Sequence, residues 1–452
     1  MKLPLWLKAL VLVAPALALV AFGPRGQTEI PAGRVVVTYW EKWTLDEGRA
    51  IKTIVSRFNE TVGRDKGVWV NYTALGDVDK RMLIATAGGD PPDIAGLSDR
   101  FVPQYADQDA LLPLDNMMAE HGIDAGAFKP IWLDICRYRG KLYALPSTPF
   151  TIALFYNRAH FRAAGLDPDR PPQTTAEFTE YAVKLTRFET GGAKAAGRDD
   201  RIVQLGFTPS PSMLGWWHWV WPGFFGGRLW DGERFHIDDE PGRAAYEWLM
   251  DYRNRVGNRA VVQFEGQGSV IESAQNPFLA GRLSMVFQGP WFTKWAMRYA
   301  PELDYGVAPF PSSDPARKHV LASCDVFVIP RSAKHPREAM MFLSYLMSQP
   351  VLEELNREHG KVSPFRSPLP SFYEGHPNPH VRIFDEMATS ADCFGYPQMP
   401  TWGEAWTETL FMTENTLRGV RPPADEVRDA QLRVDAIVAQ YDRAAARRKA
   451  RQ

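Results

Sequence analysis

The sequence has little of what several functional classes require. Its 52 Lys and Arg residues are balanced by 53 Asp and Glu residues, so no basic surplus indicates a nucleic-acid partner. Its three cysteines, Cys136, Cys324 and Cys393, lie far apart without the spacing of a metal site. An oxidising compartment would permit one disulfide, although three small buried side chains are the simpler expectation. We expect neither a metal nor a cofactor.

Motifs of covalent chemistry are also absent. The sequence contains no Gly-x-Ser-x-Gly elbow, no Gly-x-x-x-x-Gly-Lys-Ser/Thr phosphate loop and no His-Glu-x-x-His. Its nine histidines are scattered. A glycosidase needs two carboxylates about 5–10 Å apart around the scissile bond. Nothing in the sequence pairs the carboxylates that could serve, which are Asp99, Glu41, Glu265 and Glu404.

Only the N-terminus carries a long apolar run. It extends from Ala9 to Phe22, follows Lys2 and Lys8, and is rich in small residues. This pattern is typical of a secretory signal. The run is shorter than the roughly 20 apolar residues of a spanning helix, although an uncleaved anchor remains the alternative. We therefore expect residues 1–30 to be a signal peptide or an N-terminal anchor.

The rest of the chain is typical of an α/β protein, with 45% apolar and 23% charged residues. Strand and helix patterns alternate at its start, over residues 34–39, 47–60, 68–72, 79–86 and 94–97. This alternation predicts parallel strands joined by right-handed crossovers. Ligands bind at the carboxyl ends of such strands. Two polar segments follow them, Trp40-Glu41-Lys42-Trp43 and Ser98-Asp99-Arg100.

The stretch from Gly140 to Arg162 predicts a crossing between two lobes. Pro146 and Pro149 hold the chain extended between apolar strands at 141–145 and 151–156. Asn157 can then cap a helix.

Later patterns predict further elements. Thr174 begins a helix to Thr186 with a capping box, and Ser269–Gly281 is expected to be a helix ended by glycine. The other expected elements are strands at 203–207, 283–287 and 324–330, a hairpin at 228–237, and helices at 241–256, 336–347 and 424–441.

Four indoles gather within Gly215–Gly227, and they are Trp216, Trp217, Trp219 and Trp221. They exceed what one helix face needs for packing, because adjacent residues on a helix point in different directions. Indole rings suit sugars, whose C–H faces are apolar while their hydroxyl edges need hydrogen bonds. For any single ring a core position is equally plausible, but at least one ring is expected to face a ligand. His218, among them, is interpreted as structural.

Several stretches resemble the family 1 extracellular solute-binding proteins, the maltose-binding-protein-like receptors of sugar-importing ABC transporters. They are LYALP, IALFYNRAHFRAAGLDPDRPPQTTAEF, PPDIAGLSDRFVPQYADQDALLPLD, Gly289-Pro290-Trp291 and PQMPTWGEAWTETL. The resemblance covers roughly Arg34 to Tyr441. It implies an α/β, two-lobed periplasmic-binding-protein-like fold of type II, with hinge crossings and a central cleft. The implied N-terminal lobe is 34–148 plus 322–375, and the C-terminal lobe is 152–316 plus 380–445.

The resemblance also implies ligand contacts. It places Asp99 and Arg100 at the ligand and Glu41 and Lys42 near it, and it makes Trp291 a stacking ring. In the last stretch it implies that Trp402 or its neighbours Gly403 and Glu404 contact the ligand. The aromatic pair of maltose binders is not reproduced in register there. The complete candidate set is Trp40, Glu41, Lys42, Trp43, Asp99, Arg100, Phe150, Trp217, Trp219, Trp291 and Trp402.

The sequence therefore predicts a receptor, not an enzyme. It would be a periplasmic monomer, free or anchored to the inner membrane, that captures a mono- or oligosaccharide or a polyol and delivers it to an ABC permease. One alternative is a secreted carbohydrate-active enzyme. Another is a receptor for a glycerol-3-phosphate-like solute, for which Arg100 and Lys42 are the available cations. A polyamine ligand would need more acidic residues than the predicted cleft offers.

Overall fold

The computed structural model describes residues 30–192, 200–211, 217–268 and 270–450. The predicted signal region lies outside these residues except for Ile30, and Trp216 lies outside them too. Among the described helices, none is both long enough and apolar enough to span a membrane.

The first of two main sheets gathers strands from distant parts of the chain. Its order is β13-β12-β3-β1-β2, and β6 also pairs with β12. β1 is parallel to β2 and β3, as the alternating pattern predicted, whereas β12 is antiparallel to β3 and β6. The strands are β1 (Val35–Glu41), β2 (Val68–Ala74), β3 (Ile94–Ser98), β6 (Leu145–Thr151), β12 (Val320–Val328) and β13 (Cys393–Phe394).

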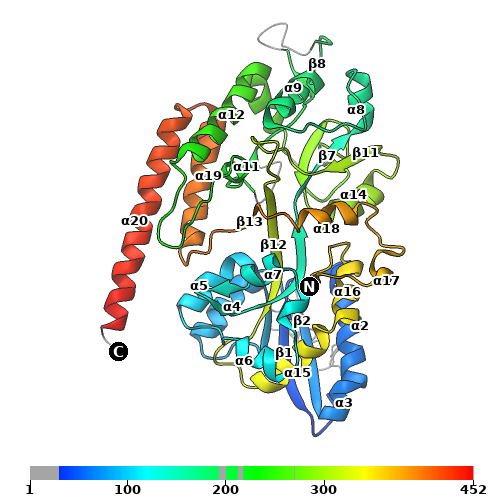
Figure 1. Ribbon diagram of the computed structural model, residues 1–452, viewed down its shortest axis with the longest axis vertical. Coiled ribbons are helices and arrows are strands. Elements are labelled where there is room, and N and C mark those ends of the chain that lie inside the picture. Colours follow the sequence, from blue (N-terminus) through cyan, green and yellow to red (C-terminus); the bar gives the residue numbers. More distant parts are fainter. Residues whose placement is uncertain (1–29, 193–199, 212–216, 269, 451–452) are drawn as a thin grey trace, which may run out of the picture.

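Helices enclose this sheet in the lower half of the molecule (Figure 1). In α2, Ile51 and Phe58 are fully buried, and the Phe58 ring meets Phe342 of α15 with 5.0 Å between ring centroids. The elements are α2 (Leu45–Glu60), α3 (Val62–Lys66), α4 (Val78–Ala87), η1 (Asp99–Phe101), α5 (Val102–Asp107), α6 (Asp115–Glu120), η2 (Ala125–Ala127), α7 (Pro130–Ile135), α15 (Pro336–Leu346) and α16 (Gln349–Glu358), with β4 (Arg137–Tyr138) and β5 (Lys141–Leu142) as a small ribbon.

The second sheet has three strands and forms the centre of the upper half (Figure 1). β7 (Ala153–Asn157) is entirely buried between antiparallel β10 (Met285–Gln288) and β11 (Tyr305–Ala308). Around it lie α8 (Arg158–Ala163), α9 (Thr175–Leu185), α11 (Trp221–Phe224), α12 (Glu240–Val256), α13 (Asn258–Glu265), α14 (Phe292–Tyr299), α19 (Trp402–Arg418), α20 (Pro423–Lys449) and the ribbon of β8 (Arg187–Phe188) with β9 (Ile202–Gln204).

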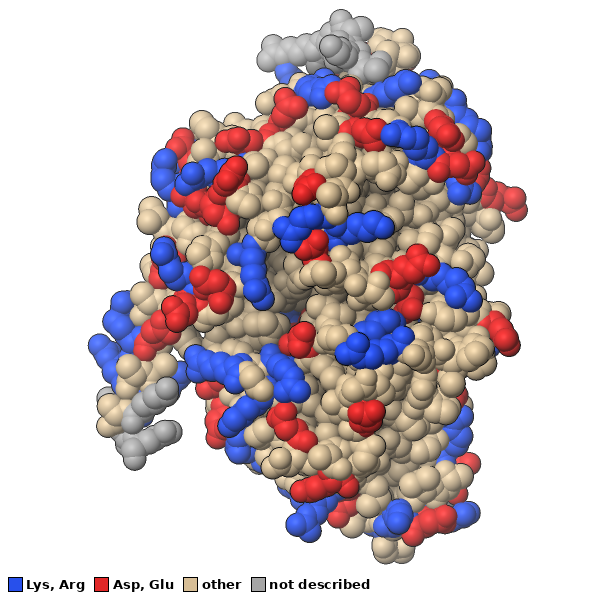
Figure 2. Space-filling model, in the orientation of Figure 1, with Lys and Arg blue, Asp and Glu red and all other residues tan. Residues whose placement is uncertain are grey.

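The chain passes from the first sheet to the second at Ile152, between β6 and β7, as the proline-rich stretch predicted. β12 and the segment 391–401 also run between the halves, and α17 (Pro370–Tyr373) and α18 (Val381–Met387) lie where the halves meet (Figure 1). The face seen in Figure 1 is hollowed between the halves, and charges of both signs are mixed across it (Figure 2).

Local capping follows the sequence closely. The side chain of Asn157 accepts a hydrogen bond from the His160 N–H at 3.0 Å, and that of Thr174 accepts one from the Glu177 N–H at 3.1 Å. Both predicted helix starts are therefore confirmed.

One predicted helix is wrong. Residues 270–281 form turns and bends instead of a helix. The Asn276 amide donates to the Ile271 carbonyl, and its oxygen accepts from the Phe278 N–H. Such local bonds compete with helical pairing, and Pro277 supplies no N–H to a helix.

The three cysteines are free thiols; Cys136 and Cys324 are buried and Cys393 is half-buried. The expectation of small buried side chains is confirmed for the first two.

Candidate binding site

A cleft of about 1200 Å³ opens between the two halves. The lower half contributes the end of β1, η1, and faces of α2 and α16, and the upper half contributes α14. The residues that line it and are used below are Lys42, Trp43, Glu47, Asp79, Arg100, Phe150, Trp217, Trp291, Asp325, Lys361 and Tyr396.

Three rings form an aromatic wall of this cleft. The Trp291 indole, at the start of α14, stacks on Trp217 with centroids 5.9 Å apart and planes at 25°. Phe150, on β6, meets Trp291 edge-on at 4.9 Å. A Cβ on Gly289 would lie 2.3 Å from the Trp291 ring, so glycine is required for the indole to fold back over its own turn.

A charged cluster lies beside this wall. The Asp325 carboxylate, on β12, accepts an ion pair from Lys42 Nζ at 3.0 Å and another from Lys361 Nζ at 3.0 Å. Thr148 Oγ1 connects Asp325 with Lys361, because it lies 3.0 Å from Asp325 Oδ2 and 2.9 Å from Lys361 Nζ. The Lys361 side chain is only 5% exposed and that of Asp325 14%. Two ammonium groups therefore share one nearly buried carboxylate.

The lysines keep this carboxylate ionised. Burial would raise the pKa of Asp325, but Lys361 and Lys42 outweigh it and hold the pKa below its usual range. Burial would likewise lower the pKa of Lys42, but Asp325 and Glu41 raise it above the ordinary value. At neutral pH Asp325 and Lys42 are therefore both charged.

Asp99 and Arg100 occupy different positions at the end of β3. Asp99 is fully buried, accepts from Ser323 Oγ at 3.0 Å, and does not line the cleft. Burial raises the pKa of Asp99 to about 7. The Arg100 guanidinium does line the cleft and lies 4.6 Å from the Phe101 ring centroid and 5.2 Å from that of Trp406.

Glu41 lies behind the cleft and not in it. It is fully buried, and it accepts hydrogen bonds from the Tyr39 hydroxyl at 2.9 Å and the Lys42 N–H at 2.8 Å. A Cβ on Gly96 would lie 1.7 Å from Glu41 Oε2, so glycine makes room for this carboxyl. Burial raises the pKa of Glu41 to about 7, against the opposing charge of Lys42.

The structure brings together six of the predicted candidates as cleft-lining residues, which are Lys42, Trp43, Arg100, Phe150, Trp217 and Trp291. Glu41 and Asp99 lie beneath them. Trp40 packs against the core within β1. Trp402 lines a side pocket of about 200 Å³ with Arg100, Gly403 and Trp406. His218 is buried, with its Nε2 3.1 Å from Thr409 Oγ1, which agrees with a structural role.

Sequence reasoning missed Asp325, Lys361 and Tyr396. Asp325 stands alone in the apolar strand CDVFVIP, and a buried charge requires a partner. That signal could have identified Asp325, but not the two lysines, because their pairing depends on the tertiary fold.

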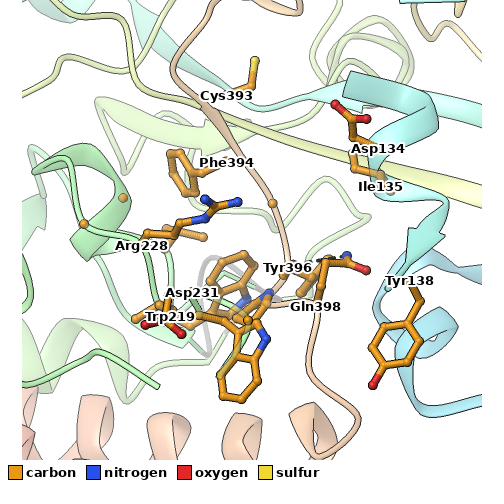
Figure 3. A pocket seen from close by; sticks show the side chains of 18 of the residues that line it. Asp134, Ile135, Tyr138, Trp219, Arg228, Asp231, Cys393, Phe394, Tyr396 and Gln398 are labelled. Carbon is orange, nitrogen blue, oxygen red and sulfur yellow. Dashed lines mark hydrogen bonds between the residues drawn. The ribbon is translucent and has the colours of Figure 1, made fainter. Parts of the chain in front are cut away.

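A second pocket, of about 880 Å³, lies against the other side of the segment 391–401. In Figure 3 this segment runs through the view, with Phe394 and Arg228 on one side and Asp134 and Tyr138 on the other. Tyr396 lines both this pocket and the cleft. Trp219 lies here, 1% exposed, with its ring centroid 4.8 Å from that of Tyr396.

A contact between the halves borders the second pocket. The Tyr441 hydroxyl of α20 donates to Asp107 Oδ2 at 2.5 Å, while Tyr138 OH donates to Asp107 Oδ1 at 2.8 Å. Helix α20 packs on α12 and α19 in the upper half, whereas Asp107 ends α5 in the lower half. Helix α20 therefore spans the junction between the halves.

The chain resembles known binding proteins in sequence and in structure. A binding protein of Brucella abortus (strain 2308) is 22% identical over 79% of this chain and 82% of its own. An sn-glycerol-3-phosphate-binding periplasmic protein of Pectobacterium atrosepticum is 26% identical over 38% of each chain. The solved structure of CpMnBP1 with mannotriose bound is 24% identical, with a TM-score of 0.74, and covers 88% of this chain and 99% of its own.

The structural likeness identifies the fold as the two-lobed one that the sequence predicted. The family profile described as bacterial extracellular solute-binding protein matches residues 42–351, which is more than half of the chain. The chain therefore belongs to the bacterial extracellular solute-binding protein family.

Proposed function

We propose that this protein is an extracytoplasmic receptor that captures a carbohydrate, either a mono- or oligosaccharide or a polyol, and delivers it to an ABC permease. The observation that carries the proposal is that one cleft between two lobes contains both the aromatic wall and the charged cluster. Indole faces match the C–H faces of a sugar ring, and the charged groups match its hydroxyl edges.

Unfilled hydrogen-bonding groups in the cleft support this proposal. Among the described residues, neither Arg100 Nε nor Trp43 Nε1 has a hydrogen-bond partner, although both atoms are buried. The carboxylates of Glu47 and Asp79 line the same cleft and can accept. A hydroxyl group both donates and accepts, so a polyhydroxylated ligand could satisfy both kinds of group.

A glycerol-3-phosphate-like solute is the second candidate. Six Lys and Arg residues line the cleft, including Lys42, Lys361 and Arg100, and cations of this kind bind phosphate. The relative from Pectobacterium atrosepticum, which binds sn-glycerol 3-phosphate, supports this candidate over a limited part of the chain.

The proposed cycle includes no covalent step. Ligand that touches both lobes only when they are closed favours the closed state, which the permease would then recognise. We propose lobe boundaries at 34–148 plus 322–375 and at 152–316 plus 380–445, a periplasmic location and a monomeric state. A secreted carbohydrate-active enzyme is the alternative, and it would release product.

The test is a thermal-shift screen of the mature protein with mannotriose, maltotriose, glycerol and glycerol 3-phosphate. A ligand at 100 times its Kd should add about 2.7 kcal/mol to the free energy of unfolding. Chromatography of the same mixtures should show unchanged sugar. Turnover of an oligosaccharide would exclude the receptor, and so would the absence of any shift across a wide panel of sugars and polyols.

A further inference from the structure

Lys361 belongs to the charged cluster and also contacts the aromatic wall. It follows α16 in the lower lobe, yet its Nζ lies 5.4 Å from the Phe150 ring centroid and 5.9 Å from that of Trp291. Trp291 belongs to the upper lobe. A single ammonium group therefore contacts rings that are carried by different elements.

The position of this ammonium is fixed from the other side. Asp325 Oδ2 accepts from it at 3.0 Å and Thr148 Oγ1 at 2.9 Å, and the side chain is 5% exposed. A nearly buried cation held by two acceptors cannot move freely, and a desolvated cation interacts more strongly with aromatic rings than an exposed one.

Lys42 provides a natural contrast. It pairs with the same carboxylate at 3.0 Å, but its side chain is 28% exposed, and no ring contact of its ammonium occurs among the described residues. The two lysines thus share the electrostatic role, whereas only Lys361 also meets the rings.

We propose that Lys361 is a positioning residue of the binding site, which holds the Phe150–Trp291 pair where a ligand can stack on it. The inference rests on the proposed function, because it assigns the wall to ligand binding. Its physical basis is that the ring orientation is set by a charge anchored on Asp325 and Thr148, so that the lower lobe fixes a surface of the upper one.

The matched test compares Lys361→Met with Lys42→Met. Each variant leaves one ammonium on Asp325, but only Lys361→Met removes the ring contact. The difference in near-ultraviolet circular dichroism between each ligand-free variant and the parent is sensitive to the stacked Trp217–Trp291 pair, and calorimetry with mannotriose monitors binding. We expect Lys361→Met to change the indole signal and to weaken mannotriose binding at least tenfold. Lys42→Met should keep the indole signal, and Lys361→Arg should restore most of it.

The outcomes separate the two proposals. An indole signal that is unchanged in Lys361→Met, or altered equally in Lys42→Met, overturns the positioning role whatever the ligand is. If neither mannotriose nor any other ligand of the screen binds the parent protein, the proposed function is overturned. The indole signal still tests the positioning role in that case. If Lys361→Met does not fold, Thr148→Val removes one anchor of the ammonium and should shift the signal in the same direction by a smaller amount.

Discussion

The cleft and the second pocket lie on either side of the same segment, 391–401, but differ in how their charges are held. In the cleft, Asp325 is nearly buried between two lysines. In the second pocket, Asp392 pairs with Arg317, whose side chain is 54% exposed. Desolvated charges are costly unless paired, while exposed pairs are screened by water. The comparison indicates that the buried charges of the cleft cost desolvation free energy, as expected of a functional site.

The largest effect should come from removing the carboxylate of the cleft. Asp325→Asn leaves two ammonium groups without their shared partner, so the free energy of unfolding should fall by about 3–5 kcal/mol. Urea denaturation measures the change. The matched variant Asp392→Asn, in the second pocket, should have little effect. Equal losses in both variants would remove the distinction between the two sites.

Truncating the stacking ring should come next. Trp291→Ala removes the central ring of the wall, and loss of such an anchor costs about 2–3 kcal/mol of binding, or roughly a hundredfold in Kd. Calorimetry with the best ligand of the screen measures it. Trp230→Ala, in the second pocket, is the control and should bind normally. If Trp291→Ala binds the ligand as tightly as the parent does, the ligand does not bind against the aromatic wall.

The two carboxyls buried beneath the cleft, Glu41 and Asp99, should also respond to pH in the opposite sense to the carboxyls of the second pocket. Burial raises the pKa of Glu41 and of Asp99 to about 7, so the folded state binds protons more tightly than the unfolded state. Stability should therefore fall as pH rises from about 4.5 to 7, by up to about 1 kcal/mol per pH unit for each group, and level off above 7.

Asp231 and Asp392, which line the second pocket, have a lowered pKa, Asp231 through hydrogen bonds to backbone N–H groups and Asp392 through Arg317. Their contribution is lost on acidification, which is the opposite sign. Thermal denaturation of Glu41→Gln between pH 4.5 and 7 should give a flatter profile than the parent. A profile that stays as steep would show that Glu41 is not the group that titrates.

The smallest effect concerns the contact that borders the second pocket. Closing the cleft should widen the space on the other side of the segment 391–401, and the Tyr441–Asp107 hydrogen bond resists this movement. Tyr441→Phe should therefore raise ligand affinity about two- to fivefold, since only part of the energy of one hydrogen bond favours the open state. Tyr138→Phe removes a bond to the same carboxylate within one lobe and should leave affinity unchanged. Similar affinities in both variants would contradict the role of the contact.

The sequence predicted the parts of this architecture that depend on local chemistry. The parallel start of the first sheet, the caps at Asn157 and Thr174 and the crossing at Ile152 all follow from neighbouring residues. Lys42 and Arg100 were candidates because each follows the end of a parallel strand, and the family resemblance placed Arg100 at the ligand and Lys42 near it.

What the sequence could not provide depends on distant contacts. The orientation of each indole between Trp217 and Trp221 depends on packing, so Trp217 reaches the cleft while Trp221 is fully buried in the core. The pairing of Lys361 with Asp325 joins a residue after α16 to a strand in the middle of the sheet. No local pattern encodes such a pair.

The ring of Tyr396 has a consequence of its own. Because it lines the cleft on one side and the second pocket on the other, it forms part of the wall that separates them. Its bulk sets the depth of each. A smaller side chain at this position would thin the wall between the two pockets.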